Sequence, residues 1–309
     1  MTDGKAGMES QCVGLAEALD LTPIVKRVQL RWPWRELTPY MRIGGRAQFA
    51  SGSDGLNPPW PDLLIATGRH SVAASILVKQ LSGGRTKTVQ LQNPVISSKN
   101  FDLVVVPRHD QLGGENVIST RGALHRVTPE LLHKSAERLG LQVMRLERPF
   151  ISVLIGGSNA VYRMGAAEMT TLARQLASCA RDMNASVLIT PSRRTGEDLM
   201  RILEIELLQV PHYIWDGQGE NPYFGLLELA DFIVVTCDSV NMVSEAAHTG
   251  KPVYVFDLPG GSEKFSRFHR ALREEGIIRP FTGPVAPYTY TPPDDVGMVA
   301  KRVQALLDG

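Results

Sequence analysis

The chain has 309 residues, which is long for a single hydrophobic core and predicts two domains of about 150 residues each. Apolar residues make up 43% of the sequence and charged residues 21%, as in ordinary soluble globular proteins. A formal net charge of +1 gives no electrostatic reason to expect a nucleic-acid partner. No apolar run approaches the roughly 20 residues that span a bilayer, and the N-terminus lacks a basic-then-apolar signal.

Three cysteines, Cys12, Cys179 and Cys237, are widely spaced along the chain. This number and spacing predict neither a disulfide framework nor a zinc site, and no metal is expected. The sequence therefore predicts a cytoplasmic protein with reduced thiols, and it leaves peripheral membrane contact open.

The first half of the chain alternates helices and strands. A polar loop, TDGKAG, occupies residues 2–7 directly before the first expected helix. Such a loop usually follows a strand, so either the domain starts on the loop or a strand precedes the recorded start. Residues 43–61 are rich in Gly, Ser and Pro and predict a loop. The expected helices cover about 8–20, 70–81 and 129–139, and the expected strands cover 61–67, 87–92 and 101–107.

The second half repeats this alternation more regularly. Its strands are continuously apolar, which predicts a parallel sheet covered on both faces and therefore a doubly wound domain. A Pro-rich stretch, 284–293, leads to a last helix with an apolar stripe. We expect domains at 1–145 and 146–285, followed by a crossover and C-terminal helix at 286–309. The expected strands cover 149–157, 186–190, 212–216, 231–235 and 252–256. The helices expected between them cover 164–183, 196–208, 222–230 and 239–249.

The loop after the first strand of the second half contains two glycines and a serine. In open parallel sheets, ligands bind outside the carboxyl ends of the strands, at a topological switch point. Gly156, Gly157 and Ser158 lie at such a strand end. They predict a phosphate-binding loop, because glycines let backbone N–H groups approach an anion. A tight turn that requires glycine is the alternative.

The loop after the second strand contains two arginines and two hydroxyl side chains. Ser192, Arg193, Arg194 and Thr195 suit phosphate, because a guanidinium matches its oxygens in a bidentate manner. Alternatively, Thr195 caps the following helix and the arginines are only solvated.

A third polar cluster opens the helix expected at 239–249. Asp238 or Ser239 is expected to cap this helix, whose N-terminus favours an anion. Glu245 lies further along the helix and is followed by two alanines, so it can face the binding cleft and accept hydrogen bonds from ribose hydroxyls. An exposed surface position for Glu245 is the alternative.

Three loops of the first half are expected to face the same cleft. His70 or His109 can act as a general base, because histidine titrates near neutral pH, and Asp110 is an alternative base. A structural role remains open for each histidine. Neighbouring residues at a strand end point apart, so His109 and Asp110 are not expected to form a dyad. The polar and glycine residues of these loops are Asp3, Gly4, Lys5, Arg69, His70, His109 and Asp110.

Two stretches contain tryptophan. Trp215-Asp216-Gly217 ends a strand and can either frame a nucleobase or pack into the core. RWPWRELTPY, at 31–40, can contact a membrane interface or an acceptor, although burial against the domain's own core is the favoured interpretation.

Several nucleotide-binding and hydrolase motifs are absent from the sequence. It contains no GxxxxGK[ST] motif and no GxGxxG followed by an acid about 20 residues later. It also lacks GxSxG and HExxH. A P-loop nucleotidase, a dinucleotide-binding Rossmann enzyme, an α/β-hydrolase and a zincin are therefore not expected.

The chain resembles the mitochondrial fission Elm (elongated mitochondria) family, and within it the bacterial members. The resemblance follows the chain in order through TDGKAGMESQCVGLAEAL, PDLLIATGRHS, VQLQNP, FDLVVVPRHD, ISVLIGGSN and TCDSVNMVSEAAHTGKPVYVF. Members of this family usually have a few strand-like residues before TDGKAG. The architecture is also similar to GT-B, the fold of nucleotide-sugar glycosyltransferases and of UDP-GlcNAc 2-epimerases.

This resemblance implies two doubly wound, Rossmann-like α/β domains facing a cleft, with the C-terminal helix packing back on the N-terminal domain. It implies a nucleotide-sugar site in the second domain and an acceptor side in the first. By position, Gly157, Ser158, Ser192 and Arg193 would meet the diphosphate, Asp238 and Ser239 the sugar-phosphate, and Glu245 the ribose.

The activity implied is metal-independent glycosyl transfer from a nucleotide-sugar co-substrate to an unknown acceptor, which can be lipid-linked. His70 or Asp110 would be the base, and no cofactor is expected. Two alternatives stay open. One is a nucleoside-diphosphate-sugar epimerase or hydrolase. The other is a non-catalytic adaptor, since plant members are linked to the recruitment of a dynamin-type protein to mitochondria.

Overall fold

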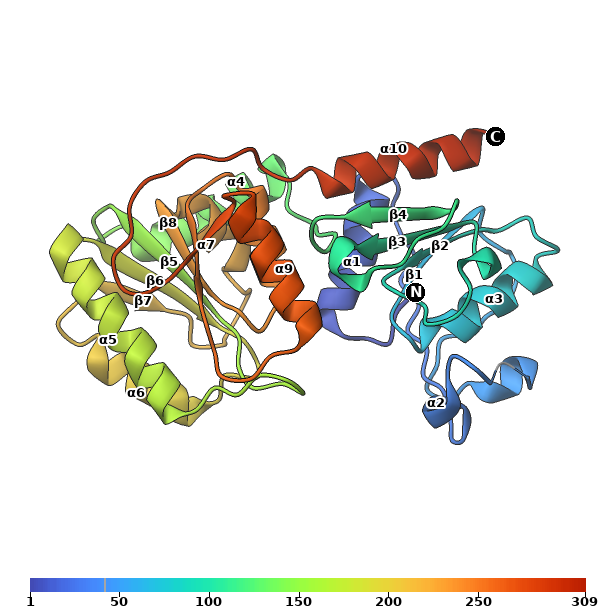
Figure 1. The fold of residues 1–309 in the computed structure, drawn as a ribbon, viewed down its shortest axis with the longest axis horizontal. Helices are drawn as coiled ribbons and strands as arrows, with labels where there is room; N and C mark the ends of the chain where they lie inside the picture. The colour runs from blue at the N-terminus through green and yellow to red at the C-terminus, as the bar shows by residue number, and fades with distance from the viewer. Residues whose placement is uncertain (42) are drawn as a thin grey trace. The chain divides into compact units, whose positions relative to one another are not determined.

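The chain forms two compact α/β units (Figure 1). The structure is a computed structural model that describes residues 1–41 and 43–309. Unit 1 comprises Met1–Arg126 and Asp294–Gly309, and unit 2 comprises Val127–Pro293. Each unit has its own parallel sheet, as the continuously apolar strands predict.

Unit 1 is built on a four-stranded parallel sheet of order β1-β2-β3-β4. Its strands are β1 (Leu63–Thr67), β2 (Lys87–Leu91), β3 (Leu103–Pro107) and β4 (Val117–Thr120). Its helices are α1 (Ala6–Glu17), α2 (Trp34–Leu37), α3 (Ser71–Leu81) and α10 (Asp295–Asp308), with short 3-10 turns η1 (Gly45–Gln48), η2 (Ser98–Asn100) and η3 (Arg108–Asp110).

The two faces of this sheet are covered by different helices, because successive strand residues point to opposite sides. Ile65 and Val89 pack in one cluster with Leu15 of α1 and Val299 of α10. Leu64 packs on the other face in a cluster with the α3 side chains. The last helix of the chain therefore belongs to the core of unit 1, as the fold resemblance implies.

Unit 2 contains a six-stranded parallel sheet of order β10-β9-β8-β5-β6-β7. Its strands are β5 (Phe150–Ile155), β6 (Ser186–Pro191), β7 (His212–Ile214), β8 (Phe232–Thr236), β9 (Val253–Phe256) and β10 (Ile278–Pro280). Its helices are α4 (Pro129–Val143), α5 (Ala166–Met183), α6 (Glu197–Glu206), α7 (Tyr223–Leu229), α8 (Val240–His248) and α9 (Glu263–Glu274).

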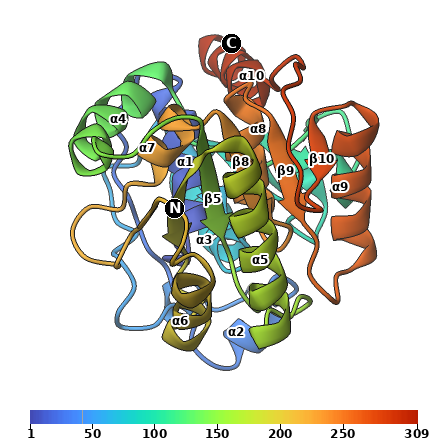
Figure 2. The same ribbon diagram turned by 90° about the vertical axis from the view of Figure 1, so that its left-hand side faces the viewer.

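Helices cover both faces of the unit 2 sheet (Figures 1 and 2). Ile151 and Val187 pack with Leu172 of α5 in the largest apolar cluster. Phe150 packs in a second cluster with Leu139 of α4 and with α7. The site loops described below are therefore anchored at the edge of a sheet that is buried on both sides.

The helices, strands and domain boundary of the structure differ from the sequence-based expectations in several respects. The helix expected at 129–139, which we assigned to the first domain, is α4 and belongs to unit 2, because Leu139 packs against Leu226 of α7. Strand β4 was not predicted; most of its residues are only half-buried or exposed at the sheet edge. Helix α9 and strand β10 were also not predicted, because α9 is highly charged and buries few side chains, among them Phe268 and Leu272.

Candidate functional site

The strand order of unit 2 contains a switch point between β5 and β8. From β5 the chain builds β6 and β7 on one side, and it then crosses to build β8, β9 and β10 on the other. The loops that leave β5 and β8 begin side by side at this point, where open parallel sheets bind ligands. Hydrogen bonds join these two loops to the loop after β6, so three of the predicted loops meet.

Asp238 is the residue that ties the loops together. Its carboxylate is fully buried. Oδ1 accepts a hydrogen bond from Thr236 Oγ1 at 2.6 Å, and Oδ2 accepts one from the backbone N–H of Gly157 at 3.2 Å. Arg194 Nη2 lies 2.7 Å from the same Oδ2. A carboxylate with these partners positions the loops, and its oxygens are already in use inside the protein.

The two glycines after β5 are required by close approach of the neighbouring loops. A Cβ on Gly156 would lie 2.2 Å from both carboxylate oxygens of Asp238, and a Cβ on Gly157 would lie 2.4 Å from the carbonyl oxygen of Arg194. Neither position can hold a side chain without displacing the loop beside it. This observation supports the tight-turn interpretation of these glycines, and Ser158 next to them is exposed.

The loop after β6 is held by its two hydroxyl side chains. Ser192 Oγ donates to the carbonyl oxygen of Gly156 at 2.8 Å, and Thr195 Oγ1 donates to the same oxygen at 2.6 Å. Thr195 Oγ1 also accepts from the Ser192 backbone N–H at 3.0 Å. The sequence-based alternative of Thr195 as the helix cap is therefore replaced by a role inside the loop.

The two arginines of this loop have different surroundings. Arg194 pairs with Asp238, and its Nη1 donates to the carbonyl oxygen of Gly157 at 2.9 Å. Arg193 is exposed, and within the described residues it has no hydrogen bond or ion pair. Arg193 is therefore the guanidinium of this loop that is available to a ligand, whereas Arg194 is engaged.

The N-terminus of α8 lies at the carboxyl end of β8. Ser239 caps this helix by accepting a hydrogen bond from the backbone N–H of Met242 at 3.3 Å. The capping role therefore belongs to Ser239 and not to Asp238. A helix N-terminus at a switch point carries a partial positive charge that attracts anions.

Glu245 is buried further along α8 and contacts α7. Tyr223 Oη donates a hydrogen bond to Glu245 Oε2 at 2.5 Å. Burial raises the pKa of Glu245 to about 7, although the Tyr223 hydrogen bond partly opposes this shift. Near neutral pH, Glu245 is therefore divided between its protonated and charged forms. The sequence analysis missed Tyr223, whose one signal was its position after Pro222 at a helix start.

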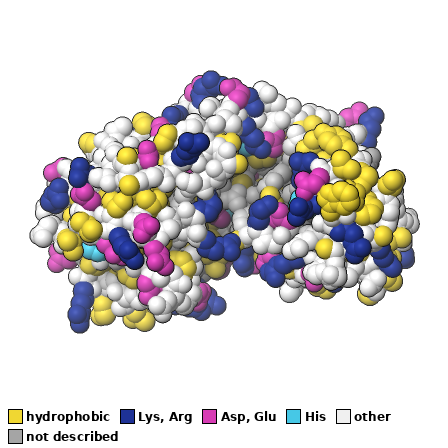
Figure 3. Space-filling model, turned by 90° about the horizontal axis from the view of Figure 1, so that it is seen from below, with side chains coloured by type: hydrophobic (Ala, Val, Ile, Leu, Met, Phe, Trp, Pro, Cys, Tyr) yellow, Lys and Arg dark blue, Asp and Glu magenta, His cyan; other side chains and the backbone are white. Residues whose placement is uncertain are grey.

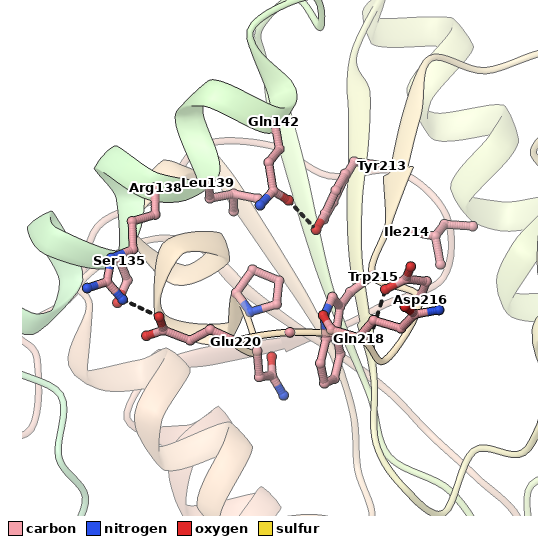
Figure 4. A pocket seen from close by; sticks show the side chains of 13 residues that line it. Ser135, Arg138, Leu139, Gln142, Tyr213, Ile214, Trp215, Asp216, Gln218 and Glu220 are labelled. Atoms are coloured by element: carbon pink, nitrogen blue, oxygen red, sulfur yellow. Dashed lines mark hydrogen bonds and ion pairs between the residues drawn. The ribbon is translucent and has the colours of Figure 1, made fainter.

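A cavity of about 600 Å³ lies beside the loop that follows β7 (Figure 4). Its walls come from α4 and from residues 213–222. Trp215 lines it, and its Nε1 donates to the carbonyl oxygen of Gln218 at 2.8 Å. Tyr213 Oη donates to Gln142 Oε1 at 2.8 Å, and Arg138 pairs with Glu220. Asn221 and Pro222 also line the cavity, and in the sequence they directly precede Tyr223, the partner of Glu245.

In unit 1, His70 lies near the loop at the start of the chain. Lys5 Nζ forms an ion pair with Asp3 Oδ2 at 2.6 Å. Burial lowers the pKa of His70, whereas the Asp3 carboxylate opposes this effect and nearby cations reinforce it. This downward shift favours the neutral imidazole, the form that a general base needs. Its neighbour Arg69 uses Nε to donate to the carbonyl oxygen of Thr38 at 2.6 Å.

His109 and Asp110 are closer together than we expected. His109 Nε2 lies 3.9 Å from Asp110 Oδ1, and both side chains are buried. The expectation that they point apart was wrong, because residues 108–110 form the 3-10 turn η3 instead of extended strand. Their burial makes them less accessible to an acceptor than the half-buried His70.

Unit 1 also contains a larger groove, of about 880 Å³, beside β1. It is lined by residues 21–26, by Leu63–Ile65 and by part of α1. The Met1 ammonium donates to the carbonyl oxygen of Ile65 at 2.6 Å, and the Thr2 backbone N–H donates to the carbonyl oxygen of Lys26 at 3.0 Å. Residues 1 and 2 thus lie between β1 and the segment at 26–28.

No group of three or more His, Cys, Asp or Glu side chains among residues 1–41 and 43–309 is arranged to hold a metal ion. In the same described residues, no helix is both long and apolar enough to cross a membrane.

The sequence analysis also missed Asn159, whose Nδ2 donates to the carbonyl oxygen of Asp238 at 3.1 Å. Its position directly after Gly-Gly-Ser was the available signal.

Solved structures with a similar fold define the class of this protein. UDP-GlcNAc 2-epimerase from Methanocaldococcus jannaschii has a TM-score of 0.50 and 11% sequence identity, over 81% of this chain and 77% of that one. A Listeria monocytogenes protein whose assigned activity is UDP-N-acetylglucosamine 2-epimerase has the same TM-score of 0.50 and the same 11% identity, over 81% of this chain and 67% of that one. The two α/β units thus have the GT-B fold.

The chain belongs to the mitochondrial fission ELM1 family, whose model matches residues 6–307. "Mitochondrial fission protein ELM1" of Arabidopsis thaliana is 33% identical over 274 residues, which are 79% of this chain. The match spans 63% of the length of that relative. A Rickettsia prowazekii protein, RP120, is 26% identical over 288 residues, with 80% of each chain covered.

Proposed function

We propose that unit 2 binds a nucleoside-diphosphate sugar and that the protein transfers the sugar to an acceptor, without a metal or another cofactor. The observation that carries this proposal is the meeting of three strand-to-helix loops at the switch point between β5 and β8. The N-terminus of α8 and the unpaired guanidinium of Arg193 lie on these elements and favour a diphosphate.

The same site suggests a place for the nucleoside. The cavity beside Trp215 has a volume in the range of small-ligand pockets, and an indole ring can stack on a base. Glu245 is the proposed ribose partner. Its carboxylate accepts the Tyr223 hydroxyl, so a ribose hydroxyl would exchange with that hydrogen bond.

Transfer with inversion requires a base for the acceptor and stabilisation of the leaving diphosphate. The acceptor oxygen attacks the anomeric carbon, the bond from that carbon to the diphosphate oxygen breaks, and the acceptor proton passes to the base. His70 is the preferred base because burial lowers its pKa, which favours the neutral form, and because it is half-buried, whereas Asp110 is buried. The α8 N-terminus and Arg193 stabilise the charge on the diphosphate. The proposal includes both lipid-linked and soluble acceptors.

A second candidate function is a non-catalytic adaptor that retains the fold. It is favoured by the internal pairing of three predicted ligand residues, since Arg194 is paired with Asp238 and Glu245 with Tyr223. Membership of the mitochondrial fission ELM1 family is compatible with either function. An epimerase or hydrolase acting on the same donor is distinguished from a transferase by analysis of the products.

Calorimetric titration with UDP, GDP, CDP, ADP and dTDP tests the proposed site. We expect micromolar binding of one nucleotide, and a loss of about tenfold or more in Arg193→Ala, because a charge-assisted hydrogen bond contributes about 1.5–3 kcal/mol. Arg201→Ala is the matched control, since it removes an exposed arginine on α6. Absence of binding by all five nucleotides to the folded protein would favour the adaptor function.

A further inference from the structure

Unit 1 exposes large apolar side chains on one short segment. Trp32 is 76% exposed, Tyr40 69%, Ile43 76% and Leu37 48%. We call the described residues 31–41 and 43–46 the α2 loop, because helix α2 lies within it. The favoured sequence-based interpretation, burial of this stretch in the core, was wrong for Trp32 and Tyr40. Figure 3 shows hydrophobic side chains gathered on the unit 1 surface, with charged side chains beside them.

The α2 loop is held in place by specific contacts beneath its exposed side chains. Trp34 packs against a core cluster of unit 1, and its Nε1 donates to the carbonyl oxygen of Ile43 at 2.6 Å. Gly44 has a φ of 108°, and a Cβ there would lie 2.9 Å from the Trp34 ring. Thr38 is buried, and its carbonyl oxygen accepts from Arg69. The apolar side chains are therefore displayed on an ordered base.

The charge of the α2 loop is predominantly positive. The described residues of this loop include three exposed arginines, Arg31, Arg35 and Arg46, and one acidic residue, Glu36. Arg35 Nε pairs with Glu36 Oε1 at 2.9 Å, and Arg31 Nε donates to the carbonyl oxygen of Phe49 at 3.1 Å. Arg46 is exposed, and its side chain has no hydrogen bond or ion pair within the part of the chain that the structure describes.

We propose that the α2 loop docks on an anionic lipid membrane surface. Tryptophan and tyrosine prefer the boundary between headgroups and acyl chains, where one end of the ring is apolar and the other is hydrated. Leu37 and Ile43 add apolar area, and the arginines complement anionic headgroups. Neither of the two cavities described above includes a residue of this loop, so it offers a projecting surface and not a groove for a peptide.

This inference does not depend on nucleotide binding by unit 2. The α2 loop does lie close to the proposed base His70, because Thr38 of the loop accepts a hydrogen bond from Arg69, the residue before His70. Docking would bring His70 near the membrane surface, where a membrane-embedded acceptor would be presented.

Flotation of the full chain with lipid vesicles tests the proposal. Phosphatidylcholine vesicles with and without phosphatidylglycerol are compared at low and high salt. We expect binding to the anionic vesicles that weakens as salt rises, because salt screens the arginine–headgroup attraction. The double variant Trp32→Ser/Ile43→Ser is expected to lower the partition coefficient about tenfold or more. The double variant Arg35→Glu/Arg46→Glu is expected to lower the partition coefficient on the anionic vesicles but not on the phosphatidylcholine vesicles.

Two control variants make the result specific. Ile205→Ser/Leu208→Ser removes two exposed apolar side chains of unit 2 and is expected to bind as the unchanged protein does. Arg302→Glu reverses an exposed charge on α10 and is expected to have little effect. Circular dichroism and thermal unfolding verify that each variant is folded.

The proposal is overturned if the folded protein binds neither type of vesicle, or if the unit 2 control loses binding as much as the α2 loop variant. It is also overturned if the protein ignores vesicles but self-associates in sedimentation experiments, and Trp32→Ser abolishes that association. In this last case the α2 loop would be an interface between protein chains.

Discussion

Asp238 shows how one buried residue organises the candidate site. Its carboxylate joins the loops after β5, β6 and β8, and it fills the space beside Gly156. The requirement for glycine at 156 therefore comes from a carboxylate inside the protein. A bound phosphate is not needed to explain it.

Gly156→Ala is expected to destabilise the protein by about 2–4 kcal/mol, because the new methyl group would displace the buried Asp238 carboxylate from its partners. Gly140→Ala is the matched control. Gly140 lies within α4 with no neighbouring atom where its Cβ would be, so alanine is expected to stabilise by about 0.5–1 kcal/mol. Chemical denaturation measures both changes, and equal effects of the two substitutions would contradict this account.

Glu245 makes stability dependent on pH. Its pKa rises from an ordinary value of 4.5 to about 7 on folding, because the carboxyl is buried. Between these pH values the folded state binds more protons than the unfolded state, so stability falls as the pH rises through this range. The loss is about 3 kcal/mol and is complete above about pH 7.

We expect Glu245→Gln to remove this component of the pH dependence, because glutamine stays neutral and still accepts the Tyr223 hydrogen bond. Relative to the unchanged protein, the variant gains stability as the pH rises from about 4.5 to about 7. Chemical denaturation at a series of pH values measures this difference in the free energy of unfolding. Glu274→Gln, at an exposed position on α9, serves as the control. Parallel profiles for all three proteins would mean that Glu245 is not buried in this way.

At the scale of elements, α10 connects the end of the chain to the core of unit 1. Val299 and Val303 are fully buried in the cluster that also contains Leu15 and Val105. The apolar stripe in the sequence predicts this helix and its buried face. The fold resemblance implies its partner, which the structure identifies as the sheet face shared with α1.

Val299→Ala is expected to destabilise unit 1 by about 1–3 kcal/mol, through lost burial and the cavity left behind. Met298→Ala, at the neighbouring position on the same helix, is the control. Met298 is 43% exposed, so its replacement is expected to change stability by less than about 0.5–1 kcal/mol. Thermal unfolding compares the two variants, and similar losses would show that α10 is not docked as described.

At the scale of the whole molecule, the two units differ in how the chain builds them. Unit 2 is formed by one continuous segment, 127–293, whereas unit 1 requires 1–126 together with 294–309. The apolar clusters of unit 2 lie within its own segment. The sheet of unit 1 has one face that depends on side chains from the end of the chain.

We therefore expect residues 127–293 to fold alone, and residues 1–126 alone to be unstable. A fragment in which residue 126 is linked to residue 294 is expected to restore the missing face of unit 1. Cooperative thermal unfolding by circular dichroism measures each fragment. Cooperative unfolding of 1–126 with the stability of the linked fragment would show that α10 adds nothing to unit 1.

The sequence determined the class of fold and the strand-end loops at which we propose a site. Continuous apolar strands separated by helices require parallel sheets covered on both faces, and the polar loops at strand ends are the candidate ligand positions. These features depend on local patterns, so β5, β6, β8 and the loops at 156–158, 192–195 and 238–239 could be predicted. Edge strand β4 was missed because most of its residues are half-buried or exposed, and helix α9 was missed because it is highly charged and buries few apolar side chains.

Only the tertiary structure decided which side chains remain available to a ligand. Arg193 and Arg194 are adjacent and chemically identical in the sequence, but Asp238, more than 40 residues away, engages Arg194 alone. The exposure of Trp32 and the partnership of Glu245 with Tyr223 are likewise set by distant segments. Burial and hydrogen-bond partners depend on contacts between residues far apart in the chain, and a local pattern does not contain that information.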